Sequence, residues 1–173
     1  MPLCSGEYEY TTPSPSVIFV SRPTSGSFGG VTRGDTICQN DADAANLGGT
    51  YTAWLSTYGV DARDRVVNNP LGYELPSGVT VATGLADLLD GTLRAAITET
   101  ASGQQSTVTH VWTGTDSYGR LHPGGDNCLD WTSAIELGCI GKTSEINGSW
   151  TWYGTTRCTN LRGIYCVRDE LEL

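Results

Sequence analysis

The 173-residue chain carries 19 acidic and 10 basic residues, which give it a formal net charge of −9. Nucleic acids, heparin-like polyanions and anionic membranes are bound through basic surfaces, so this charge argues against all three as partners. The length is that of one domain, and 22 glycines with only 38% hydrophobic residues indicate that loops form much of it. The longest apolar runs, at 17–20 and 85–89, are far shorter than the ~20 residues of a membrane span, and we expect no direct membrane insertion.

The cysteines are even in number, and four of the six lie after residue 127. Such a set is typical of disulfide-bonded proteins in an oxidising compartment, so we expect a secreted or cell-surface protein; buried free thiols are the alternative. Zinc is not expected, because no CxxC occurs and His110 and His122 do not have the Cys/His spacing of a zinc site. The sequence alone leaves the pairing open among Cys4, Cys38, Cys128, Cys139, Cys158 and Cys166.

The first half of the chain predicts an arm, a strand and a helix in that order. Residues 1–16 are rich in Ser, Thr, Pro and Tyr and indicate an arm or linker. Met1 before Cys4 is typical of an added start codon on a mature fragment, and Cys4 could then be lipid-modified, free or bonded. Residues 17–20 predict a buried strand. A helix is expected to start with Thr32 or Asp35 as N-cap and to stop at residues 48–49, which are both glycine.

The remaining elements are expected to be short strands, with one more short helix at 84–93. Residues 51–56, 108–113, 150–153 and 163–167 carry the β-branched and aromatic side chains that are typical of strands. By the two-residue period of a strand, Trp150 and Trp152 would share one side and Tyr153 would take the other. The other tryptophans, Trp54, Trp112 and Trp131, are predicted to lie in the core.

Three stretches resemble the C-type lectin-like fold and, within it, the endostatin-like branch. They are the segment 18–56, which includes GVTRGDTICQNDADAANLGGTYTAWLS, the segment 111–133 (VWTGTDSYGRLHPGGDNCLDWTS), and the ending LRGIYCV. The motifs NCLDWTS, SWTWYG and LRGIYC are also similar to an uncharacterised bacterial family of secreted and surface proteins of this fold. The resemblance implies an α+β domain over 17–169 with short antiparallel strands, one or two main helices and long loops, between the arm 1–16 and a tail at 170–173.

The resemblance also implies how the cysteines pair. In the C-type lectin-like fold the helix cysteine bonds to the cysteine on the last strand, and an inner pair staples the long loops. For this chain the implied disulfides are Cys38–Cys166, Cys128–Cys158 and, from the remaining two cysteines, Cys4–Cys139.

The known ligand chemistry of the resembling families does not carry over to this chain. Calcium-dependent sugar-binding members carry a Glu-Pro-Asn or Gln-Pro-Asp loop and a Trp-Asn-Asp strand, whereas this chain has HPG at 122–124 and WTW at 150–152. Endostatin binds heparin through arginines and zinc through N-terminal histidines, and both features are missing here. A different calcium site is the one cofactor that the loops allow, with solvated turn residues as the alternative for Asp116, Asp126, Asn127 and Asp130.

These observations predict a binding module and no enzyme. No GxSxG, HExxH or phosphate-loop motif occurs. We expect an extracellular or cell-surface adhesion module, part of a larger adhesin, fibre or lipoprotein, that recognises a glycan or a protein through its long-loop face. The alternative is a structural or oligomerisation domain without a dedicated ligand, trimeric if it belongs to a fibre. The expected ligand-binding residues are Tyr118, Arg120, His122, Asp126, Asn127, Trp150, Trp152 and Tyr153.

Overall fold

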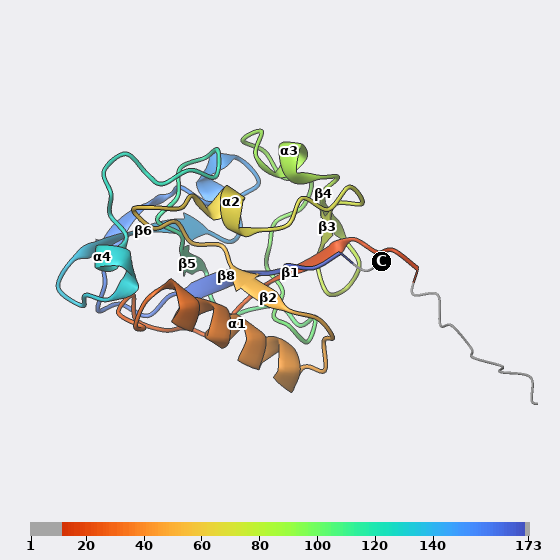
Figure 1. Ribbon diagram of the computed structural model, residues 1–173, viewed down its shortest axis with the longest axis horizontal. Coiled ribbons are helices and arrows are strands. Elements are labelled where there is room, and N and C mark those ends of the chain that lie inside the picture. The colour runs from red at the N-terminus through yellow and green to blue at the C-terminus, as the bar shows by residue number, and fades with distance from the viewer. Residues whose placement is uncertain (1–11, 172–173) are drawn as a thin grey trace, which may run out of the picture.

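Two strands from opposite ends of the chain lie side by side at the centre of the sheet. In the computed structural model, which describes residues 12–171, β1 (Ser16–Val20) pairs antiparallel with β8 (Gly163–Arg168), and Phe19 lies opposite Cys166. The strand order is β4-β3-β1-β8-β5-β6-β7, and β2 also pairs with β8 (Figure 1). The other strands are β2 (Tyr51–Ala53), β3 (Tyr73–Glu74), β4 (Thr80–Ala82), β5 (His110–Trp112), β6 (Leu137–Lys142) and β7 (Gly154–Arg157).

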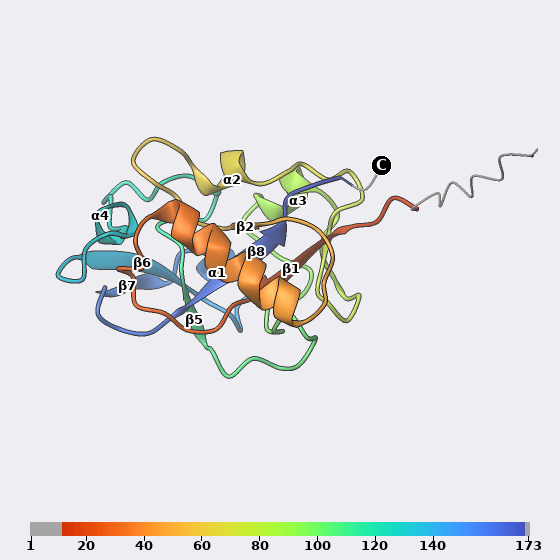
Figure 2. The same ribbon diagram turned by 60° about the horizontal axis from the view of Figure 1, so that its bottom comes forward.

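The described chain has an α+β fold with few helices. They are α1 (Val31–Ala44), α2 (Ala62–Arg65), α3 (Leu85–Leu88), α4 (Cys128–Trp131) and the 3-10 turn η1 (Gly148–Trp150). Only α1 exceeds one turn, and it lies across β1, β2 and β8 (Figure 2). The expected helix at 84–93 is therefore reduced to α3, and the expected strand at 51–56 to β2.

The two central strands are buried on both faces. Alternate side chains point to opposite sides of a strand, and Ile18 and Val20 of β1 enter one apolar cluster while Phe19 enters the other. Tyr165 and Ile164 of β8 divide in the same way. Trp54, Trp112 and Trp131 are fully buried, which confirms their predicted place in the core.

The helix α1 is held close to the sheet by its small residues. Gly34, Cys38 and Ala42 recur every four residues and form its buried side. A Cβ on Gly34 would lie 2.8 Å from Leu55 Cδ1, so only glycine permits this separation. The Asp35 carboxylate accepts the N–H of Ala53, the last residue of β2, and thereby joins the helix to that strand.

Both predicted ends of this helix were wrong. Its N-cap is Gly30, which has a positive φ of 102° that is unfavourable for residues with a side chain. Gly30 donates its N–H to the carbonyl of Trp131. Its C-terminus is closed by Asn46, with φ 57°, while Leu47 donates to the carbonyl of Ala42. This is the Schellman arrangement, in which asparagine replaces the more usual glycine, so the helix ends before the glycines at 48–49.

Two disulfides of the expected pairing are present. Cys38 of α1 bonds to Cys166 of β8, across a sequence separation of 128. Cys128 bonds to Cys158, which directly follows β7, across a separation of 30. Cys4 lies outside the described residues, so the expected Cys4–Cys139 disulfide stays a prediction.

The segment α4 is a left-handed turn that the sequence did not reveal. Cys128, Leu129, Asp130 and Trp131 have φ values of 55°, 51°, 52° and 66°. The left-handed conformation disfavours each such residue by roughly 1–2 kcal/mol. The turn is held by the disulfide at Cys128, by the stacking of Trp131 on Phe28 at 5.6 Å, and by two hydrogen bonds to the carboxylate of Asp130.

Candidate functional site

The long loop between β5 and β6 folds on itself before it reaches α4. An isolated bridge joins Thr115 to Leu121, and the N–H of Asp116 bonds to the carbonyl of Arg120. The next turn is closed by the N–H of Gly125, which donates to the carbonyl of His122. Figure 1 shows this loop, in teal, beside the blue segment that contains η1. We call the exposed surface of residues 114–127 and 150–153 the loop face.

The first part of the loop face presents an aromatic ring beside a cation. The Tyr118 side chain is 52% exposed, and the Arg120 guanidinium lies 5.6 Å from its ring centroid. The Asp116 carboxylate accepts the N–H groups of Tyr118 and Arg120 and forms an ion pair with the Arg120 side chain at 3.1 Å. Asp116 therefore stabilises the turn that presents Tyr118.

The second part is a stacked pair. The rings of His122 and Trp152 have centroids 3.8 Å apart and an interplanar angle of 28°. Both side chains are half-buried, so each keeps one part of its ring accessible. The Nδ1 atom of His122 accepts the N–H of Gly124, which fixes the ring within its turn. Two of the expected ligand-binding residues are thus in direct contact.

The expected strand at 150–153 is absent, and its two tryptophans have different environments. Trp150 is the last residue of η1, and β7 begins only at Gly154. Trp150 is 1% exposed and packs against Trp54 and Tyr165 in the core. The prediction that Trp150 and Trp152 share a side was wrong, because a 3-10 turn does not follow the two-residue period. Trp150 cannot contact a ligand from the core.

The ring of Tyr153 completes the aromatic residues of the loop face. It is 50% exposed, and it lies 5.3 Å from the His110 ring and 5.2 Å from the Lys142 ammonium group. Burial, followed by the positive charges of Arg162 and Lys142, lowers the pKa of His110. His110 was not among the expected site residues. It lies opposite Lys142 in the register of β5 and β6, and this proximity follows only from the pairing of the two strands.

Asn127 and Asp130, two candidates for the expected calcium site, are engaged in structural hydrogen bonds near α4. Asn127 is fully buried; its side chain accepts the N–H of Asp130 and donates to the carbonyl of Ser56 and to the carboxylate of Asp130. Asp130 also accepts the N–H of Tyr58. These contacts favour the turn-residue alternative for both residues.

Asp126 has a different setting, beside a buried thiol. Donor atoms of His122, Asp126 and Cys139 all lie within 4.8 Å of one another. Cys139 is fully buried in β6 and is the one free cysteine among residues 12–171. Burial, and secondly the Asp126 carboxylate, raises the pKa of the Cys139 thiol to about 12. Of the predicted metal-binding residues, only Asp126 belongs to this group.

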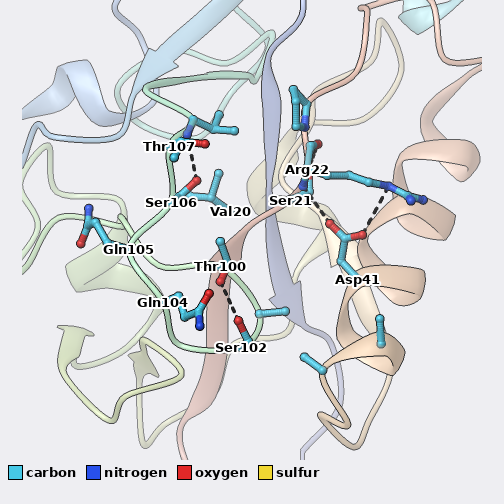
Figure 3. A pocket seen from close by; sticks show the side chains of 15 residues that line it. Val20, Ser21, Arg22, Asp41, Thr100, Ser102, Gln104, Gln105, Ser106 and Thr107 are labelled. Atoms are coloured by element: carbon cyan, nitrogen blue, oxygen red, sulfur yellow. Dashed lines mark hydrogen bonds and ion pairs between the residues drawn. The ribbon is translucent and has the colours of Figure 1, made fainter.

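A separate cavity of about 560 Å³ lies between the end of β1, the C-terminal part of α1 and the loop at 100–108 (Figure 3). Hydroxyl and amide side chains line much of it, including Thr100, Ser102 and Gln104. Among the described residues that line it, only Arg22 and Asp41 are charged, and they form an ion pair at 3.4 Å. No sequence pattern indicates this cavity, because its walls come from three segments that are distant in the chain.

The chain was matched against protein families and against curated proteins. No protein-family model matches it, and no curated protein matches it. Within residues 12–171, no helix has the length and apolar character needed to cross a membrane.

Proposed function

We propose that the chain is an extracellular or cell-surface binding module of the C-type lectin-like fold, in its endostatin-like branch, and that it recognises a glycan through the loop face. The observation that carries the proposal is the stacked pair of His122 and Trp152, flanked by the exposed rings of Tyr118 and Tyr153. The disulfide between α1 and β8 and the one that joins α4 to the segment after β7 support an oxidising compartment.

The side chains around these rings favour a glycan over a protein as ligand. Each exposed ring has a hydrogen-bonding or charged neighbour: Arg120 at Tyr118, and Lys142 at Tyr153. An aromatic face can cover the C–H groups of a sugar ring while the neighbouring polar groups bond to its hydroxyls. A protein partner would instead need a well-packed contact of about 800 Å² on each side.

A glycan array probed with the labelled chain tests this proposal. We expect binding that falls at least about thirtyfold in Tyr118→Ala or Trp152→Ala, the loss of a hot-spot residue. Leu71→Ala, which changes a 49% exposed side chain outside the loop face, is the matched control and should bind as the parent does. Capture of a protein that requires Trp152, without any glycan signal, would instead assign the loop face to protein recognition.

A second candidate, self-association, rests on an apolar group at one end of the molecule. Leu129, Ile135 and Leu137 are 54%, 92% and 45% exposed. All three lie between the bridged residues Asn127 and Gly138, Leu129 in α4 and Leu137 at the start of β6. A dimer or trimer in sedimentation analysis, lost in Ile135→Asp, would support a structural domain, in accordance with a place in a larger adhesin or fibre.

A further inference from the structure

We propose that His122, Asp126 and Cys139 form a binding site for one zinc ion, with a fourth position left open. The site would lie beneath the loop face, beside Trp152. It does not depend on whether the loop face binds a glycan.

The three side chains are brought together by backbone pairing. The turn closed by Gly125 and His122 places the imidazole four residues before Asp126, whose carbonyl accepts the N–H of Cys139. The donor atoms come from two segments whose separation is set by main-chain hydrogen bonds, so the group does not depend on mobile side chains alone.

The turn leaves the imidazole and the carboxylate side by side. A Cβ on Gly124 would lie 3.1 Å from both Nδ1 of His122 and Oδ2 of Asp126. The glycine therefore leaves room beside these two atoms, and a zinc ion bound at Nδ1 would replace the Gly124 N–H that donates to it here. The stacking of Trp152 on His122 at 3.8 Å restricts rotation of the imidazole. Because the rotation of the imidazole is already restricted, it loses less conformational entropy when it binds the ion.

The donor set selects the class of metal. A thiolate, an imidazole and a carboxylate together suit zinc, whereas Ca²⁺ and Mg²⁺ prefer oxygen ligands. Tetrahedral bonds of about 2.0–2.3 Å place zinc ligands about 3.3–3.8 Å apart. The three donor atoms lie within 4.8 Å of one another, so a contraction of about 1.5 Å at most completes the site. Three protein ligands leave one position for water or a ligand atom, as in catalytic and exchangeable zinc sites.

The expected Cys4–Cys139 disulfide and the zinc site exclude each other, because each uses the same sulfur. Cys139 is buried in β6, which lies toward the end of the molecule away from the start of the described chain (Figure 1). A disulfide from Cys4 to this sulfur would require the residues that cover Cys139 to move apart. We therefore favour the zinc site, and the redox state of Cys139 is part of its test.

Titration of the unreduced, metal-free chain with Co²⁺ reports directly on the sulfur. We expect one equivalent to bind with a thiolate-to-cobalt charge-transfer absorption, and Zn²⁺ to displace it. The absorption should disappear in Cys139→Ser, and the dissociation constant should rise at least about tenfold in His122→Gln and Asp126→Asn. His110→Gln, which removes the other histidine, is the matched control and should bind Co²⁺ as the parent does.

Three results would overturn the zinc site. One is the absence of the charge-transfer absorption in a chain whose Cys139 is shown by peptide mapping to be a free thiol. Another is binding that His122→Gln and Asp126→Asn leave unchanged. The third is a Cys4–Cys139 disulfide in the native chain. If Cys139→Ser does not fold, the other two variants still decide the question, because neither changes the sulfur.

Discussion

The imidazole of His122 stacks on the indole of Trp152 at 3.8 Å, although the two residues come from different loops. The contact joins the β5–β6 loop to the segment after η1 and holds the centre of the loop face. Neither ring is fully buried, so the pair can present a surface to a ligand. By contrast, Trp150, two residues before Trp152, is fully enclosed.

This difference predicts opposite outcomes for two tryptophan substitutions. Trp150→Ala empties a core site and should lower the free energy of unfolding by about 3–5 kcal/mol. Trp152→Ala removes one contact between two partially exposed rings and should lower the free energy of unfolding by only about 1 kcal/mol. Urea unfolding measures both. An equal loss in the two variants would show that Trp152 is a core residue and would remove the basis of the loop-face proposal.

The two disulfides should differ in their contribution to stability. In the chain-entropy treatment, the Cys38–Cys166 bond, with its separation of 128 residues, stabilises by about 5 kcal/mol. The Cys128–Cys158 bond, across 30 residues, stabilises by about 3.6 kcal/mol. Replacing each pair with alanines and measuring the unfolding midpoint in urea tests the order. A larger loss from the inner pair would mean that it chiefly supports the left-handed turn.

The left-handed turn predicts an unusual response to glycine. Leu129 has φ 51° and is 54% exposed, so glycine relieves backbone strain and removes little buried surface. Relief of roughly 1–2 kcal/mol exceeds the 0.5–1 kcal/mol that glycine's greater freedom in the unfolded chain normally costs. Leu129→Gly should therefore raise the free energy of unfolding by up to about 1 kcal/mol. Leu161→Gly, at a 62% exposed leucine without positive φ, is the control and should lower it.

The pKa of His110 predicts part of the acid sensitivity. Because this pKa is lowered in the folded chain from its ordinary value of 6.5, the unfolded chain takes up the proton first as the pH falls. The stabilisation is therefore complete above pH 6.5 and is lost as the pH falls through the folded-state pKa. His110→Gln should show a smaller loss of stability between about pH 7 and pH 5 than the parent does. Unfolding midpoints across this range measure the difference, and parallel curves would contradict it.

A glycine in β6 fixes the position of η1. A Cβ on Gly141 would overlap the carbonyl oxygen of Trp150, which is backbone and cannot turn aside. Gly141→Ala should lower the free energy of unfolding by about 2 kcal/mol or more, within the range for overpacked sites. Gly154→Ala, where a Cβ meets open space, is the control. A neutral Gly141→Ala would mean that η1 moves freely relative to the sheet.

Sequence patterns predicted the elements whose buried residues recur at the regular spacing of a strand or a helix. Apolar runs predicted the central strands near β1 and β8, and the four-residue spacing of Gly34, Cys38 and Ala42 lies within the predicted helix. The disulfides Cys38–Cys166 and Cys128–Cys158 came from the resemblance to a fold, since spacing alone leaves the pairing open. The predicted ends of the helix were wrong, because Gly30 and Asn46 end it through backbone conformations and hydrogen bonds that no local sequence pattern indicates.

The amino-acid sequence by itself determined the composition of the core, the central strands, the helix that carries Cys38 and the cysteines available for bonding. These follow from hydrophobic burial and short-range geometry, which are periodic along the chain. Only the tertiary structure decided that Trp150 is enclosed while Trp152 meets His122, that residues 128–131 turn left-handed, and that Cys139 lies beside His122 and Asp126. Each of these depends on hydrogen bonds and packing between distant segments, and such contacts leave no periodic signal in the sequence.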